Sequence, residues 1–238
     1  MNPLETEFHR LYLIDEATGV APSLITVDGR VRAMVIELAR PADWPVASTV
    51  WQCVQSDLGL PPPAIAVNGN DGYQLWFSLA EPVTAAEASF FLESLRQRFL
   101  SNIAPERISM MPTENRHAQL VPALQQSTSL WSAFVSPDLA AIFADSPGLD
   151  MSPRVESQSN VLASLESIKA TVFEAIFDRL ISDVERISAT HQVSTPVVPA
   201  STKHSDSDAK RFLAEVMNDQ SVEMHLRIEA AKALLPYS

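Results

Sequence analysis

The sequence has one cysteine, Cys53, and no long apolar run. A single cysteine cannot form an internal disulfide, and it excludes a zinc site built from several cysteines. No stretch approaches the roughly 18 consecutive apolar residues that a membrane-spanning helix needs. The first residues, 1–7, are acidic and lack the basic and apolar regions of a signal peptide. We therefore expect a cytoplasmic protein without a membrane segment.

Lysine is absent from residues 1–150, which carry 8 arginines against 17 acidic residues. The whole chain of 238 residues has a net charge of −12. Proteins that bind nucleic acid tightly normally present a basic face, because counterion release supplies most of the affinity. The composition therefore argues against tight, non-specific binding to nucleic acid, and it leaves room for a small local basic site. A hydrophobic content of 46% excludes disorder of the whole chain.

Residues 1–150 alternate between helical and strand-like patterns, which predicts an α+β domain. Apolar spacing predicts helices over about 1–20 and 47–58, and the capping-box pattern of Thr84 and Glu87 opens a third helix. Two hairpins are expected, one over 24–38 around Asp28-Gly29 and one over 64–79 around the loop 68–72. A further strand is expected over 108–111, and the stretch from there to 150 has no regular pattern. We expect a central sheet of hairpins with flanking helices.

The rest of the chain is predicted to be helical. Apolar residues keep a three-and-four spacing over 162–187, which predicts one long amphipathic helix within 151–189. Its apolar stripe must pack either on the first domain or on a second copy in a homodimer. Residues 190–208 are polar and interrupted by proline, which predicts a flexible linker, and 209–238 has the pattern of a helical hairpin.

Three segments between residues 31 and 145 carry a family resemblance. They are the strand 34–39 (MVIELA), the loop and strand 68–77 (NGNDGYQLWF) with Pro82-Val83 after it, and the segment 110–139. In this order they resemble the catalytic core of the archaeo-eukaryotic primase superfamily, the primase–polymerases. The resemblance implies a primase-like fold and a role in DNA replication. The third segment is similar to the tail of family members found on mobile elements and in conflict systems.

The departures from the family pattern predict that polymerase activity is lost. Polymerisation in this family needs two or three carboxylates, because two metal ions bridge the nucleotide phosphates and activate the attacking hydroxyl. Glu37 matches the first carboxylate, but Ala39 stands where its partner is expected. Gln74 replaces the family's phosphate-binding histidine, and Ser109 lies near the third acidic position. One carboxylate cannot hold two divalent cations, so Mg²⁺ or Mn²⁺ is expected only if the site is active. In that alternative, Glu106, Glu114 or Asp71 would supply the missing ligands.

The candidate site residues follow from these segments. Glu37 is the catalytic candidate, and it is otherwise an exposed carboxylate on an alternating strand. The loop 68–72 either cradles a phosphate with its backbone N–H groups or is an ordinary hairpin turn. Tyr73 and Trp76 fall on opposite faces of their strand, so at most one can stack on a base, and both fit the core. We expect a cleft lined by Glu37, Asn70, Gln74 and Arg107. The full set of nucleotide- or nucleic-acid-binding candidates is Asn68, Asn70, Gln74, Trp76, Arg107, Arg116 and His117.

Three functions therefore stand side by side. The first is a catalytically degenerate primase–polymerase-like protein of a mobile-element or phage-related locus, which binds nucleic acid, a nucleotide or a replication partner weakly. The second is a non-enzymatic interaction module that uses the C-terminal helices. The segment 211–237 resembles the tail of small terminase subunits of phages, which implies a phage-type protein partner. The third is an active primase or polymerase with rearranged metal ligands.

Overall fold

The computed structural model describes residues 2–15, 23–113 and 116–192, and its side-chain surroundings are described up to residue 182. Residues 1–188 form one compact unit, and residues 189–238 belong to a second. The predicted linker 190–208 and helical hairpin 209–238 lie beyond the described residues, apart from the last turn of a helix that ends at Gln192. No helix within the described ranges is long and apolar enough to cross a membrane.

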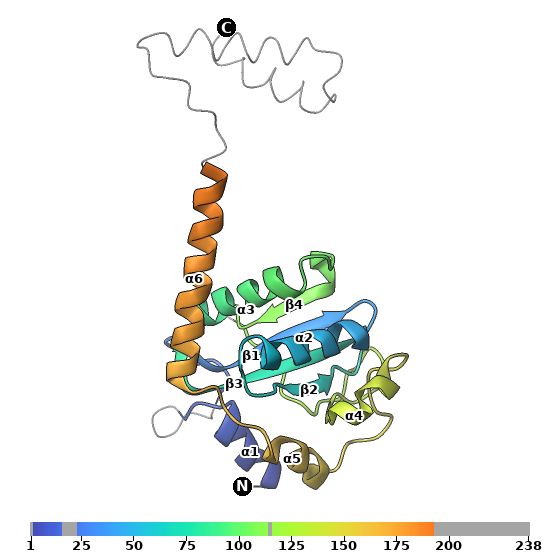
Figure 1. Cartoon of the computed structure of the whole chain (residues 1–238). Coiled ribbons are helices and arrows are strands. Elements are labelled where there is room, and N and C mark those ends of the chain that lie inside the picture. Colours follow the sequence, from blue (N-terminus) through green and yellow to red (C-terminus); the bar gives the residue numbers. More distant parts are fainter. Residues whose placement is uncertain (1, 16–22, 114–115, 193–238) are drawn as a thin grey trace, which may run out of the picture. The chain divides into compact units, whose positions relative to one another are not determined.

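A five-stranded antiparallel sheet is the centre of the unit, and the predicted α+β class is confirmed (Figure 1). The strands are β1 (Arg30–Ala39), β2 (Ala64–Val67), β3 (Gly72–Thr84), β4 (Ile108–Met111) and β5 (Ala133–Val135). Their order across the sheet is β4-β1-β3-β2-β5. The helices are α1 (Pro3–Leu11), α2 (Trp44–Ser56), α3 (Ala85–Phe99), α4 (Pro137–Ala140), α5 (Val155–Ala163) and α6 (Ala170–Gln192). Two short 3₁₀ turns, η1 (Pro105–Arg107) and η2 (Ala141–Phe143), complete the described elements.

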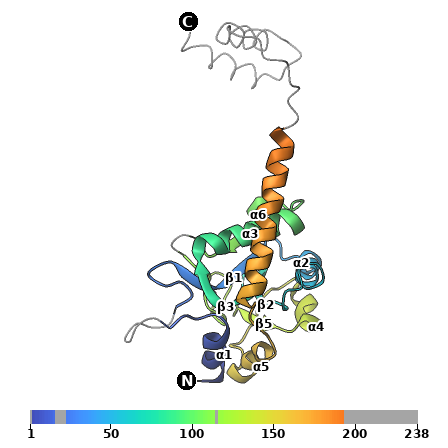
Figure 2. The same cartoon turned by 60° about the vertical axis from the view of Figure 1, so that its left-hand side comes forward.

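Alternating side chains of the strands divide the sheet into two faces. Met34, Ile36 and Leu38 of β1 face one core, which is shared with α2, α3 and the first half of α6. Ala33 and Val35 face the other core, which is built with α1 and α5. This is the period-two pattern of a strand buried on both faces. Phe173 of α6 lies 5.2 Å from Phe91 of α3 between ring centroids, and α3 crosses the direction of α6 where the two helices meet (Figures 1 and 2).

Several predicted elements are confirmed. The second hairpin forms from β2 and β3, and the predicted strand 108–111 is β4. Thr84 and Glu87 make both hydrogen bonds of the capping box that opens α3. The strand 133–135 was not predicted, because three residues are too short a run to give an alternating signal.

The predicted first hairpin is wrong beyond its turn. Gly29 takes the positive φ that the turn requires, and its N–H donates to Thr26. The arm before the turn, however, makes only an isolated bridge from Ile25 to Val31. β3 pairs with β1 along its whole length and β4 occupies the other edge at Val35–Leu38, so a local arm can reach only the first residues of β1.

The single helix predicted over 162–187 is also wrong. The structure has two helices, α5 and α6, separated by residues 164–169. In this break, the N–H of Ile168 donates to the carbonyl of Ser78 and its carbonyl accepts from Ala80. Backbone pairing with β3 therefore replaces the helical bonds, and Ile168 still fills the core. The first half of α6 buries its apolar stripe against its own unit, as one of the two predicted alternatives requires.

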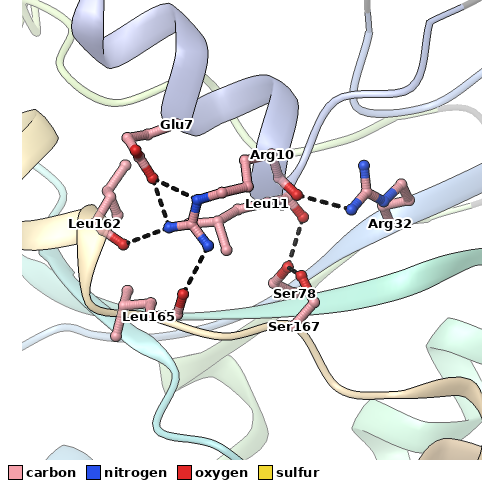
Figure 3. A network of polar contacts seen from close by, with 8 residues as sticks. All are labelled: Glu7, Arg10, Leu11, Arg32, Ser78, Leu162, Leu165 and Ser167. Carbon is pink, nitrogen blue, oxygen red and sulfur yellow. Dashed lines mark hydrogen bonds and ion pairs between the residues drawn. The ribbon is translucent and has the colours of Figure 1, made fainter.

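Two arginines fasten α1 to the sheet and to α5 (Figure 3). Arg32 of β1 donates to the carbonyls of His9, Arg10 and Leu13 around the end of α1 and to that of Leu79 on β3. Arg10 donates to the carbonyls of Leu162 and Leu165, both at 2.8 Å, at the end of α5. The carbonyl of Leu162 also accepts from the N–H of Leu165, so the guanidinium groups add hydrogen bonds to the backbone at both helix ends.

Gln158 of α5 closes the outer edge of the sheet at β5. Its side-chain oxygen accepts from the N–H of Phe134 at 2.7 Å, and its side-chain nitrogen donates to the carbonyl of Phe134 at 3.0 Å. The amide thus replaces the backbone of a sixth strand and leaves the edge without the unpaired groups that favour aggregation.

We predict that Gln158→Ala lowers the free energy of unfolding by about 2–4 kcal/mol, because two buried backbone groups lose their partner. Urea unfolding followed by circular dichroism measures this change. Asn160→Ala removes an exposed amide from the same helix and serves as the control, with a change within about 0.5 kcal/mol. Equal effects of the two substitutions would show that Gln158 is not needed to satisfy the edge.

Candidate functional site

A polar pocket of about 730 Å³ opens on the face of the sheet that carries α1 and α5. It lies where this apolar core ends and polar side chains of β1 and β3 begin. Its walls come from the loop between β2 and β3 and from the irregular segment between β4 and β5. The lining residues are Glu37, Arg40, Asn68, Asn70, Asp71, Gln74, Ser109, Met111, Arg116, His117, Ala118, Gln119, Val121, Gln125, Ser127, Thr128 and Ser132.

The floor of the pocket is one row across three strands. Glu37 of β1 is paired in register with Gln74 of β3 on one side and with Ser109 of β4 on the other. Residues paired in this way have their side chains on the same face, about 5 Å apart at Cβ. The three positions that the family resemblance singled out therefore lie side by side. Ala39, the fourth, is buried beside Gly72 at the end of β1.

A relay of two hydrogen bonds connects this floor to the core. The indole nitrogen of Trp76 donates to Oε1 of Gln74 at 2.9 Å, and Nε2 of Gln74 donates to Oε2 of Glu37 at 2.6 Å. An indole N–H can only donate and a carboxylate can only accept. The amide between them consequently has one possible orientation, with its nitrogen toward Glu37.

Trp76 itself lies inside the core and has no exposed surface. Its ring packs against Tyr12 and Phe134, with ring centroids at 5.3 Å and 5.8 Å. The prediction that Trp76 contacts a ligand is therefore wrong, because its ring is covered by α1 and β5. The alternative that both Tyr73 and Trp76 serve as core residues is confirmed, since each is fully buried on its own face.

The loop between β2 and β3 is closed on itself. Oδ1 of Asn68 accepts from the backbone N–H groups of Asn70, Asp71 and Gly72 at 2.8–3.0 Å. The N–H of Gly69 donates to Pro147. No N–H group of this loop is left for a phosphate, so the phosphate-cradle hypothesis is wrong and the hairpin-turn alternative is confirmed. Gly69 has a φ of +77°, and a Cβ there would lie 2.9 Å from the nitrogen of Ser132.

The opposite wall presents neutral amides and hydroxyls. Asn70 accepts from Ser127 at 2.7 Å and donates to Gln125 at 3.4 Å, and Gln125 in turn donates to Gln119 at 3.2 Å. These wall residues come from a segment without regular pattern, so the sequence offered no signal for Gln119, Gln125 or Ser127. The wall can hydrogen-bond both donors and acceptors of a ligand.

The cations at the rim are Arg40 and Arg116, and both are exposed. Arg116 was predicted from the sequence, whereas Arg40 was not. Arg40 directly follows β1, has a φ of +56°, and donates to the carbonyl of Glu106. Its place next to a strand that ends at the site is the sequence signal that could have identified it.

Arg107 lies outside this pocket, contrary to the prediction. Its guanidinium forms an ion pair with Asp43 at 3.2 Å and donates to the carbonyl of Pro41. It fastens the start of α2 to the turn η1, so its role in the described structure is local support.

His117 lines the pocket but uses both ring nitrogens within the protein. The N–H of Ala118 donates to Nδ1 at 2.8 Å, so Nδ1 has no proton and Nε2 carries one, which it donates to the carbonyl of Ala33 at 2.9 Å. Burial favours the neutral imidazole and lowers the pKa of His117 below its ordinary value. The ring holds the segment 116–118 against β1 and carries no charge for a phosphate.

The residues on the floor do not fit a two-metal centre. Glu37 is its only carboxylate, and that carboxylate already accepts the hydrogen bond from Gln74. Asp71 lines the pocket, Glu106 does not, and Glu114 lies outside the described residues. Among the residues that the structure describes, no three His, Cys, Asp or Glu side chains are grouped to hold a metal ion.

No family model and no curated protein matches the sequence. Among solved structures, the chain is similar to the polymerase domain from Mycobacterium tuberculosis ligase D in complex with DNA, at 14% sequence identity and a TM-score of 0.35. The alignment covers 65% of this chain and 57% of that one. This likeness concerns the fold alone.

We predict that the contribution of His117 to the free energy of unfolding decreases at acidic pH. Because the pKa is lowered on folding, the unfolded chain binds a proton first as the pH falls below about 6.5, and the stability that the neutral ring contributes is then lost. Urea unfolding at pH 7.5 and pH 5.0 measures this loss. His117→Gln removes the titration, so the difference in unfolding free energy between the parent protein and the variant should be smaller at pH 5.0. A difference independent of pH would contradict a lowered pKa.

Proposed function

We propose that the protein is a non-catalytic nucleotide- or nucleic-acid-binding protein of primase–polymerase type. The observation that carries this proposal is the pocket floor, where Glu37 is hydrogen-bonded to Gln74 and is the one carboxylate in the row that it forms with Gln74 and Ser109. The polar walls and the two rim arginines supply the remaining contacts that a nucleotide requires.

The charged side chains that line the pocket are the arginines Arg40 and Arg116 and the carboxylates Glu37 and Asp71. Arg40 and Arg116 at the rim fit a phosphate, since guanidinium groups donate paired hydrogen bonds to phosphate oxygens. The carboxylate of Glu37 repels a phosphate and accepts hydrogen bonds from N–H or O–H groups. A nucleotide would therefore place its base or sugar on the floor and its phosphate at the rim.

The same features argue against nucleotidyl transfer. Two metal ions that bridge phosphates need several carboxylates, and the positions that would supply them hold Ala39 and Ser109. The alternative with rearranged ligands would have to use Asp71 together with a residue outside the described ranges. We therefore place the protein among binding proteins.

The mobile-element or phage-related setting is part of this proposal and rests on the resemblance of the sequence segments 110–139 and 211–237. A replication or phage protein as partner is also part of this proposal and rests on the same resemblance. The interaction module that would use 209–238 falls on residues beyond the described structure, so it stays a hypothesis from the sequence.

We predict measurable binding of a fluorescent single-stranded oligonucleotide at low salt. With two phosphate contacts, the logarithm of the association constant should fall with the logarithm of the salt concentration at a slope of about −1.4. This slope is much shallower than that of a protein with a basic face. Arg40→Ala and Arg116→Ala should each weaken binding about five-fold, the effect of one lost hydrogen-bonded contact. Arg98→Ala, on α3 outside the pocket, is the matched control and should leave the affinity unchanged.

A primer–template with Mn²⁺ and nucleotides tests the second half of the proposal, and no extended product is expected. Extension that is lost in Glu37→Gln would establish an active polymerase. The absence of binding to oligonucleotides and to mononucleotides, even at low salt, would remove the proposal and direct the search to protein partners.

A further inference from the structure

We propose that the pocket floor recognises the Watson–Crick edge of a guanine base. This inference rests on the proposed function and names the chemistry that the floor selects. It starts from the pair formed by Gln74 and Glu37, whose side chains are linked at 2.6 Å.

The pair presents a fixed order of hydrogen-bonding groups. Nε2 of Gln74 carries two hydrogens, of which one is used by Glu37, so the second is a donor. Next to it, the two carboxylate oxygens of Glu37 are acceptors with spare lone pairs. Along the floor the order is therefore donor, acceptor, acceptor, which is the order that cytosine presents in a base pair.

Guanine is the complement of this order. Its O6 accepts, and its N1–H and 2-amino group donate side by side, so the carboxylate can take two hydrogen bonds while Gln74 donates to O6. Adenine, cytosine and uracil have no two adjacent donors on this edge. With any of them, one carboxylate oxygen would face an acceptor or lose its partner, which is costly at a half-buried site.

Trp76 keeps the amide of Gln74 in the orientation that selects guanine. If the amide of Gln74 could turn over, the floor would present an acceptor in place of the donor and would accept other bases. The indole N–H of Trp76 donates to Oε1 at 2.9 Å and prevents this turn. Trp76 is thus a positioning residue, which acts on the ligand through Gln74.

The guanine can belong to a free nucleotide or to a nucleic-acid strand. Both would present the same edge to the floor and a phosphate to Arg40 and Arg116 at the rim. A base in a duplex has this edge occupied by its partner, so a strand would have to offer the guanine unpaired.

Calorimetric titration of the full-length protein with GMP, IMP and AMP tests the inference. We expect GMP to bind at least about ten-fold more tightly than AMP, the usual gain from a bidentate contact to a base. IMP lacks the 2-amino group and should fall between the two. In a second arm, oligothymidylates with one central guanine, hypoxanthine or adenine are compared. Selectivity confined to this arm would identify a strand as the source.

Variants locate the selectivity. Glu37→Gln replaces one acceptor by a donor and should bring the GMP-to-AMP affinity ratio close to one. Trp76→Phe should lower the same ratio, and Gln74→Ala provides a second test if Trp76→Phe does not fold. The control is Glu174→Gln, an exposed carboxylate on α6 outside this pocket, which should keep the ratio of the parent protein.

The outcomes separate this inference from the proposed function. Equal affinity for the three mononucleotides and the three oligonucleotides would overturn guanine recognition and leave nucleotide binding in place. A preference for guanine that persists in Glu37→Gln would also overturn it, since the base would then be recognised elsewhere. No binding in either arm would contradict both proposals.

Discussion

The hydrogen bond from the indole of Trp76 to Gln74 is the contact on which the site depends. Trp76 is fully buried, so its N–H must find an acceptor inside the protein, and Gln74 is the group that provides one. This requirement decides which end of the amide faces Glu37 and hence what the pocket offers to a ligand. The ring of Trp76 packs in turn against Tyr12, which follows α1, and Arg32 of β1 fastens the end of that helix to the sheet through backbone carbonyls. The residues at the end of α1 therefore support the tryptophan that orients Gln74 on the floor of the pocket.

The register of the sheet shows how one row of three positions could form either a metal-binding site or a hydrogen-bonding surface. Register brings Ser109, Glu37 and Gln74 into one row on three neighbouring strands, and this row would suit a group of metal-binding carboxylates. With an amide and a hydroxyl in two of the three positions, the row becomes a hydrogen-bonding surface of low charge.

Local signals in the sequence predicted much of the fold. The loop 68–72, the capping box at Thr84 and the alternation within β1 and β3 each act between near neighbours, and all three are present in the structure. Elsewhere, tertiary contacts outweighed the local pattern. Ile168 pairs with the backbone of β3 and interrupts the predicted helix, and the side-chain amide of Gln158 forms the hydrogen bonds that a neighbouring strand would form. Of the site, six of the eight predicted residues line the pocket, whereas Trp76 and Arg107 do not. Arg40 could have been identified from its place directly after β1, whereas the amides of 119–125 could not, because only the fold brings that irregular segment to the pocket wall.

We propose that Glu37 binds a ligand by hydrogen bonds and does not act as a metal ligand. Calorimetric titration of GMP in the presence of EDTA, repeated with excess Mn²⁺, tests it most directly. We expect GMP to bind in EDTA and to keep the same dissociation constant, within about two-fold, after Mn²⁺ is added. Binding that appears only with Mn²⁺, and that is lost in Glu37→Gln, would show instead that the carboxylate holds a metal ion.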